Sequence, residues 1–171
     1  MHPHPILMSR VNVAAQTHAP CKLAHEQIVP RPLAEVFSFF SRAENLEALT
    51  PAWLKFRVLD VNPQPVQKGT IIQYKLQLRG LPLRWASEIV QWEPPHSFVD
   101  LQRSGPYKLW RHTHRFIAKG NSTRIIDEVL YDLPFGVLGR MAHWLIVRRD
   151  LEQIFQFREA KIRELFGAPP R

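Results

Sequence analysis

The chain has 171 residues, 45% of them hydrophobic and 22% charged, and a formal net charge of +8 at pH 7. This length fits one domain, and a domain of this size buries a core without help from disulfides or metals. Cys21 is the single cysteine, which excludes an intramolecular disulfide and favours a reducing compartment. Ten Phe, five Trp and three Tyr supply enough rigid apolar surface for a dense core or a ligand cavity.

The positive charge does not predict a nucleic-acid partner, because Lys and Arg are spread along the chain without a basic stripe or an aromatic RNA-binding motif. We expect no nucleic-acid binding, while a transient contact with an anionic membrane surface stays open. The sequence has no apolar run long enough to cross a bilayer. Its amino-terminal segment also lacks the continuous apolar stretch of a secretory signal, so we expect a cytoplasmic protein.

The amino-terminal half opens with a polar segment and then changes to regular patterns. Residues 1–20 show no sustained hydrophobic period and contain three His and three Pro. We expect a disordered tail there, followed by one domain over residues 21–167. The pattern then predicts a strand over Lys22–Val29 and two short helices over Leu33–Phe40 and Ala43–Leu49, the second ending before a proline.

From residue 56 the hydrophobic period changes from 3.6 to two. Polar and apolar residues alternate along Thr70–Arg79, as in a strand with one solvated face. Short turns containing Gly, Pro or Asn separate the segments, so each strand is expected to pair with its neighbour in sequence. We predict six more strands: Phe56–Val61, Thr70–Arg79, Arg84–Trp92, Phe98–Arg103, Tyr107–Ala118 and Thr123–Tyr131.

A helical period returns over Val137–Phe166, which predicts one helix about 45 Å long, ended by Gly167. The order of elements predicts an α+β fold. In it, a curved antiparallel sheet of about seven strands surrounds the long C-terminal helix, with two short helices after the first strand. A curved sheet and a straight helix need not touch everywhere, so an apolar cavity can remain between them.

The most informative motif is Trp110-x-His112-x-His114-x-Phe116. Side chains two residues apart on a strand share one face, and the aromatic residues at its ends indicate the covered face. Both imidazoles are therefore expected to point toward the cavity. The hairpin turn that follows sets the pairing of the next strand, and we expect it to place His112 opposite Asp127.

Asp100 and Gln102 lie on the preceding strand and are expected to face the same way, which would create a polar island within an apolar pocket. A carboxylate beside a buried imidazole raises its pKa and fixes its tautomer, so His112 and Asp127 are the candidate catalytic pair. The alternative is structural, because buried polar groups must satisfy one another's hydrogen bonds in any case.

We expect neither a metal nor a cofactor. His112 and His114 with Asp127 as the one distant acid form no complete ligand set, and the sequence has no phosphate-binding loop or dinucleotide fingerprint. The ligand-binding residues are expected to be aromatic and polar side chains that face the cavity: Tyr74, Trp85, Asp100, Gln102, Trp110, His112, His114, Phe116 and Trp144.

Over about residues 22–166 the chain resembles the START-like, or SRPBCC, superfamily of helix-grip proteins, which includes Bet v 1-type carriers, aromatase/cyclases and coenzyme-Q-binding proteins. Pro30–Phe37 is similar to the start of its first helix, and Glu93–Pro95 is similar to one of its common turns. Gln102–Phe116 and Asp127–Gly136 resemble the cyclase/dehydrase-like, ligand-binding subgroup.

The resemblance implies binding or transfer of a small apolar ligand (a lipid, quinone or polyketide-like molecule) between the sheet and the C-terminal helix. Binding without catalysis is the favoured interpretation. Two alternatives stay open: a cyclase or dehydratase that uses His112 and Asp127, and a protein-interaction module whose cavity is closed. The superfamily contains carriers and enzymes alike, so the fold does not choose between them. Sequence leaves the oligomeric state open.

Overall fold

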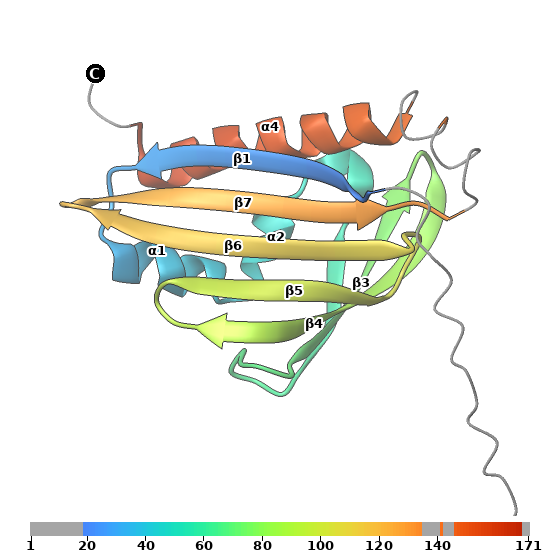
Figure 1. Ribbon diagram of the computed structural model, residues 1–171, viewed down its shortest axis with the longest axis horizontal. Helices are drawn as coiled ribbons and strands as arrows, with labels where there is room; N and C mark the ends of the chain where they lie inside the picture. The colour runs from blue at the N-terminus through green and yellow to red at the C-terminus, as the bar shows by residue number, and fades with distance from the viewer. Residues whose placement is uncertain (1–18, 135–140, 142–145, 169–171) are drawn as a thin grey trace, which may run out of the picture.

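The computed structural model describes residues 19–134, 141 and 146–168 (Figure 1). Trp144, most of the predicted tail and the first part of the predicted C-terminal helix lie outside these residues. Seven strands form one antiparallel sheet in the order β1-β7-β6-β5-β4-β3-β2. They are β1 (Cys21–Val29), β2 (Arg57–Asn62), β3 (Ile71–Leu78), β4 (Leu81–Glu93), β5 (Ser97–Ser104), β6 (Leu109–Lys119) and β7 (Ser122–Asp132).

The helices pack on the concave side of the sheet, and in Figure 1 the C-terminal helix runs along the upper edge of the molecule, next to β1. They are α1 (Leu33–Phe40), α2 (Asn45–Ala48), the 3-10 helix η1 (Ala52–Leu54) and α4 (Arg148–Phe166). The predicted α+β helix-grip fold is therefore confirmed, with two short helices after the first strand; η1 was not predicted. No helix in the described part of the chain is both long and apolar enough to span a membrane.

The first and last strands in sequence, β1 and β7, are neighbours in the sheet. The first strand pairs with the last along its whole length, from Cys21 opposite Tyr131 to Val29 opposite Thr123. Each other strand pairs with its neighbour in sequence, as the predicted meander requires. One face of this continuous sheet packs against the helices.

The β3–β4 turn is tighter than predicted. The predicted strand start at Arg84 was wrong, because Arg79 and Gly80 alone make the turn, with φ of 52° and 83°, and β4 begins at Leu81. The Arg79 guanidinium donates two hydrogen bonds to Asp150, of 3.0 Å from Nε and 2.8 Å from Nη2. This ion pair ties the hairpin tip to the first turn of α4.

The β6–β7 hairpin also differs from its predicted register. A two-residue loop closes it, and Lys119 pairs with Ser122. Asp127 therefore lies opposite His114, and the expectation that it lies opposite His112 was wrong by two residues. The ladder extends closer to the turn than the sequence pattern indicated.

Aromatic side chains fill the core where α1 crosses the sheet. Phe116 of β6 is 1% exposed, and its ring centroid lies 5.5 Å from that of Phe37 and 5.1 Å from that of Phe40. Phe98 of β5 stacks on it at 6.0 Å. These contacts anchor α1 on the sheet next to the two histidines of β6.

The alternation along β6 gives a first prediction. Phe116→Ala should lower the free energy of unfolding by about 3–5 kcal/mol, since it opens a cavity in a packed aromatic cluster. Ile117→Ala is the matched control, because Ile117 is 40% exposed on the opposite face and its loss should change stability by less than about 0.5 kcal/mol. Urea denaturation measures both; equal losses would contradict the assigned faces of β6.

Candidate functional site

A cavity of about 200 Å³ lies on the concave side of the sheet and is lined by residues of β3, β4, β5, β6, α4 and the α1–η1 segment. Its walls are mainly aliphatic and aromatic. Lining residues come from both parts of the core, including Phe40 and Ile89 from one part and Leu151 and Phe155 from the other. The predicted gap between the curved sheet and the C-terminal helix is therefore present.

One wall of the cavity is a continuous aromatic surface. Trp85 stacks on Tyr74 with ring centroids 5.8 Å apart and an interplanar angle of 19°, and it meets Trp110 edge-on at 5.3 Å. Tyr107 contacts Trp85 at 5.5 Å. Tyr74, Trp85 and Trp110, which are expected to bind the ligand, line this cavity, and Tyr107 adds a fourth ring.

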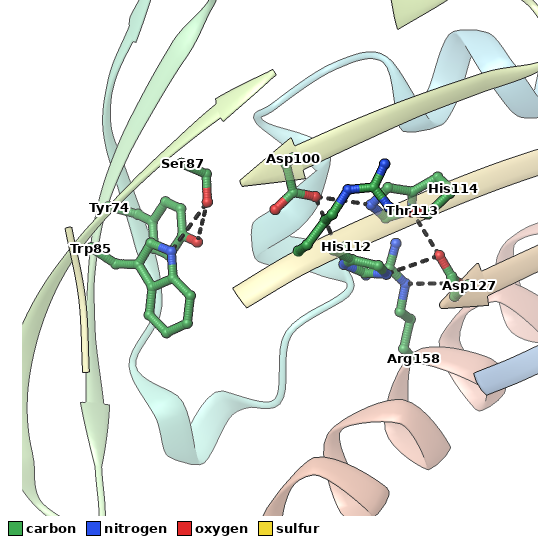
Figure 2. Close-up of polar contacts among 10 residues, drawn as sticks. Tyr74, Trp85, Ser87, Asp100, His112, Thr113, His114, Asp127 and Arg158 are labelled. Carbon is green, nitrogen blue, oxygen red and sulfur yellow. Dashed lines mark hydrogen bonds and ion pairs between the residues drawn. The ribbon is translucent and has the colours of Figure 1, made fainter. Parts of the chain in front are cut away.

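Ser87 holds two of these rings by their polar atoms. Its hydroxyl oxygen lies 3.1 Å from the Tyr74 hydroxyl and 3.1 Å from Nε1 of Trp85 (Figure 2). Ser87 is 3% exposed, so these hydrogen bonds satisfy it without water. Sequence analysis missed this residue; its position two residues after Trp85 on the same strand was the signal that could have found it.

The polar end of the cavity is formed by Asp100, His112 and His114, all three of which line it. Asp100 on β5 lies directly opposite His112 on β6. The Asp100 Oδ2 atom is 3.2 Å from Nε2 of His114 and 3.8 Å from Nδ1 of His112. The two imidazole rings lie against each other, with centroids 3.8 Å apart.

Asp127 lies on the other side of the imidazole pair (Figure 2). It comes from β7, is 2% exposed, and its Oδ1 atom is 3.2 Å from Nε2 of His112 and 2.7 Å from Nδ1 of His114. Each imidazole therefore presents one nitrogen to Asp100 and the other to Asp127. The structure brings together four of the predicted polar residues, although in a different register from the one expected.

Arg158 of α4 is a second residue of the site that sequence analysis missed. Its Nε atom lies 3.8 Å from Oδ2 of Asp127, its guanidinium lies 5.4 Å from the centroid of the Phe40 ring, and its side chain is 11% exposed. It also lines the cavity. The signal in the sequence was an arginine within the apolar stripe of the helix, between Phe155 and Ile162.

Burial and charge act against each other in this cluster. Burial alone would raise the pKa of Asp127, but Arg158 and the two histidines outweigh it and hold that pKa well below its ordinary value. The pKa of Asp100 is lowered too, since hydrogen bonding to His114 and the charge of His112 oppose its burial. Both carboxylates are therefore ionised.

The pKa values of the two histidines shift in opposite directions. Burial and the neighbouring His114 lower the pKa of His112. Burial would also lower the pKa of His114, but the charge of Asp127 and hydrogen bonding to Asp100 outweigh it and raise that pKa. The raised pKa of His114 favours its cationic form between the two carboxylates.

Two predicted ligand-binding residues lie outside the cavity. The Gln102 amide faces the β5–β6 turn, where Nε2 donates a hydrogen bond of 2.7 Å to the carbonyl oxygen of Tyr107. Phe116 lies in the aromatic core against α1. Both were expected to line the pocket because of the strand face they occupy, and both lie on that face beyond the ends of the cavity.

Comparison with known families finds one that fits this architecture. The sequence profile of a family described as "Polyketide cyclase / dehydrase and lipid transport" matches residues 29–157. This match includes the whole polar cluster except the last residue, Arg158. Among curated proteins, no sequence matches the chain significantly.

Solved structures share the fold at low sequence identity. An aromatase/cyclase from Streptomyces sp. R1128 is 12% identical, with a TM-score of 0.61 over 85% of this chain and 95% of its own. A START superfamily protein from Mycobacterium smegmatis is 13% identical, with a TM-score of 0.61 over 84% and 98%. Norcoclaurine synthase from Thalictrum is 15% identical, with a TM-score of 0.61 over 84% and 94%. At this identity the similarity shows the fold alone.

The contact between Arg158 and Asp127 leads to a second prediction. Arg158→Met keeps apolar packing against Phe40 but leaves a buried carboxylate without its cation, so it should lower the free energy of unfolding by about 3 kcal/mol. Arg163→Met is the control on the same helix, because the Arg163 side chain is 56% exposed and its loss should cost less than about 0.5 kcal/mol.

A double variant tests the reason for that loss. If the uncompensated charge is the cause, adding Asp127→Asn to Arg158→Met should recover part of the stability, giving a coupling of about 1–3 kcal/mol. Chemical denaturation of the four proteins in the cycle measures this coupling. Strictly additive losses would show that the two side chains do not interact energetically.

Proposed function

Because the chain belongs to the polyketide cyclase/dehydrase and lipid transport family, we propose that it binds a small, flat, largely apolar molecule that carries one oxygen function. The observation that carries this proposal is the composition of the cavity: an apolar, aromatic wall that ends in Asp100, His112 and His114. Such convergence of a few polar groups at one end of an apolar cavity is typical of a ligand site.

The size and shape of the cavity limit the ligand. A volume of about 200 Å³ is below the range of about 300–1,000 Å³ typical of sites for drug-sized molecules. It fits one or two rings, or the end of a longer molecule. The stacked Tyr74 and Trp85 rings present a flat face, and planar conjugated systems make the largest contact with such a wall.

The polar end favours a hydroxyl or enol over a simple carbonyl. Asp100 offers acceptor oxygens, whereas Arg158 offers donors, and both line the cavity. Among the described residues, Nη2 of Arg158 is buried and has no hydrogen-bond partner. A hydroxyl both donates and accepts, so it is able to satisfy Asp100 and a neighbouring donor at once.

A pair of matched probes tests this selectivity. Naphthalene and 2-naphthol share a two-ring body and differ in one hydroxyl group. We expect 2-naphthol to bind roughly tenfold more tightly, since a hydrogen bond to a charged group contributes about 1.5 kcal/mol, and Asp100→Asn should reduce this ratio. Isothermal titration calorimetry measures it. Equal affinities of both probes for the parent protein would contradict a polar anchor.

Filling the cavity tests where the probe binds. Leu83 lines the cavity, so Leu83→Trp should weaken 2-naphthol binding at least ~10-fold by occupying the space of the probe. Leu81→Trp is the control from the same strand, because Leu81 is 69% exposed at the hairpin tip. If both variants bind like the parent, the probe lies elsewhere on the protein.

Catalysis is a second candidate function, favoured by the contact of 3.2 Å between His112, which lines the cavity, and Asp127. An imidazole held in this way can remove a proton next to a carbonyl group. The probe is 2-tetralone, an enolisable two-ring ketone, whose hydrogen–deuterium exchange is followed by NMR. A catalytic His112 requires exchange to slow at least ~10²-fold in His112→Ala; no acceleration by the parent protein would leave binding as the function.

A further inference from the structure

We propose that Asp100, His112 and His114 bind one divalent transition-metal ion, such as zinc, in the wall of the cavity. One donor atom from each of the three residues lies within 4.8 Å of the donor atoms of the other two. Two imidazoles and one carboxylate make a donor set that suits zinc and the neighbouring transition metals. The ion would occupy the same polar end of the cavity as the ligand proposed above, but its binding does not require that ligand and would be measurable even if neither naphthalene probe bound.

The strands of the sheet place these donors together. His112 and His114 are two residues apart on β6, so they share one face, and Asp100 on β5 lies directly opposite His112. All three ligands therefore come from two hydrogen-bonded strands, whose backbones fix the distances between them. A site built on strands in this way needs little rearrangement to accept an ion.

Two of the donor–donor distances are close to those of a tetrahedral site, and the third is no longer than 4.8 Å. Metal–donor bonds of about 2.0–2.2 Å imply donor atoms about 3.4 Å apart in a tetrahedron. The Asp100 Oδ2 atom lies 3.2 Å from Nε2 of His114 and 3.8 Å from Nδ1 of His112. An ion placed between these atoms replaces one hydrogen bond and needs only side-chain adjustment.

Asp127 gives the strongest support, because it occupies the position of a carboxylate behind metal-bound imidazoles. Its Oδ1 atom is hydrogen-bonded to Nε2 of His112 at 3.2 Å and lies 2.7 Å from Nδ1 of His114, an ion-pair contact without hydrogen-bond geometry. In metal sites the free ring N–H of a histidine ligand is usually held by such a carboxylate, which orients the ring and strengthens the ligand. Arg158 in turn partners Asp127 at 3.8 Å.

The ion would keep an open position toward the cavity. Three protein ligands leave one position of a tetrahedron for water or an oxygen atom of a bound molecule, as in catalytic rather than structural zinc sites. With neutral imidazoles, the ion, Asp100, Asp127 and Arg158 sum to a charge of +1. An anionic oxygen, such as hydroxide or an enolate, would neutralise it, so the ion would select oxygen-bearing ligands and polarise them.

The test uses cobalt and zinc on full-length protein purified without a polyhistidine tag. The parent carries His2→Ala and His4→Ala, which removes two tail histidines able to bind metals adventitiously. After dialysis against EDTA, Co²⁺ binding is followed by its visible d–d absorption and Zn²⁺ binding by calorimetry. We expect one equivalent per chain. Asp100→Asn should weaken binding at least ~10-fold by removing a ligand, and Asp127→Asn roughly 10–100-fold by removing the supporting carboxylate.

His96→Ala is the matched control, because His96 is an exposed histidine in the turn between β4 and β5 and its loss should leave the affinity unchanged. Zn²⁺ should also raise the Tm of the parent but not that of Asp100→Asn. Near-UV circular dichroism confirms that the variants are folded, and Asp100→Asn decides the question if a histidine variant does not fold. The proposal is wrong if the parent shows no saturable Co²⁺ band, or if Asp100→Asn binds as tightly as His96→Ala.

Discussion

A carboxylate that is 2% exposed has to be neutralised by its neighbours, and at Asp127 this requirement organises the centre of the domain. Two imidazoles from β6 and a guanidinium from α4 meet it from two sides. The sheet and the C-terminal helix are thus joined by charge as well as by apolar contacts. The same contacts fix the orientation of both imidazoles, which leaves their other nitrogens facing Asp100 and the cavity.

The cavity follows from the mismatch between a curved sheet and a straight helix. Where α1 and the end of α4 contact the sheet, phenylalanine side chains fill the space between helix and sheet. Farther along, Trp85, Tyr107 and Trp110 lie against one another and line the cavity. Ser87 and the Arg79–Asp150 pair hold the adjoining hairpin in place. The result is a small rigid site whose two ends differ in polarity, a property that suits selection of amphipathic molecules.

The sequence predicted the architecture well because its signals were periodic. The change from a period of two to 3.6 identified the sheet and the helix, and the spacing of two along β6 placed both histidines on the covered face. The errors came from features that carry no period. The Arg79–Gly80 turn and the β6–β7 register depend on how many residues a hairpin loop takes, which shifted Asp127 from His112 to His114.

Side-chain contacts across elements were likewise beyond pattern analysis. Arg158 and Asp127 are 31 positions apart and meet only when α4 packs on the sheet, and the orientation of Gln102 toward the Tyr107 backbone depends on the shape of one turn. The polar end of the cavity is expected to orient the bound ligand. A crystal structure of the complex with 2-naphthol tests this directly: the hydroxyl oxygen should lie within hydrogen-bonding distance of the cluster formed by Asp100, His112 and His114. Density for the probe outside the cavity, or with its hydroxyl directed away from that cluster, would contradict the account.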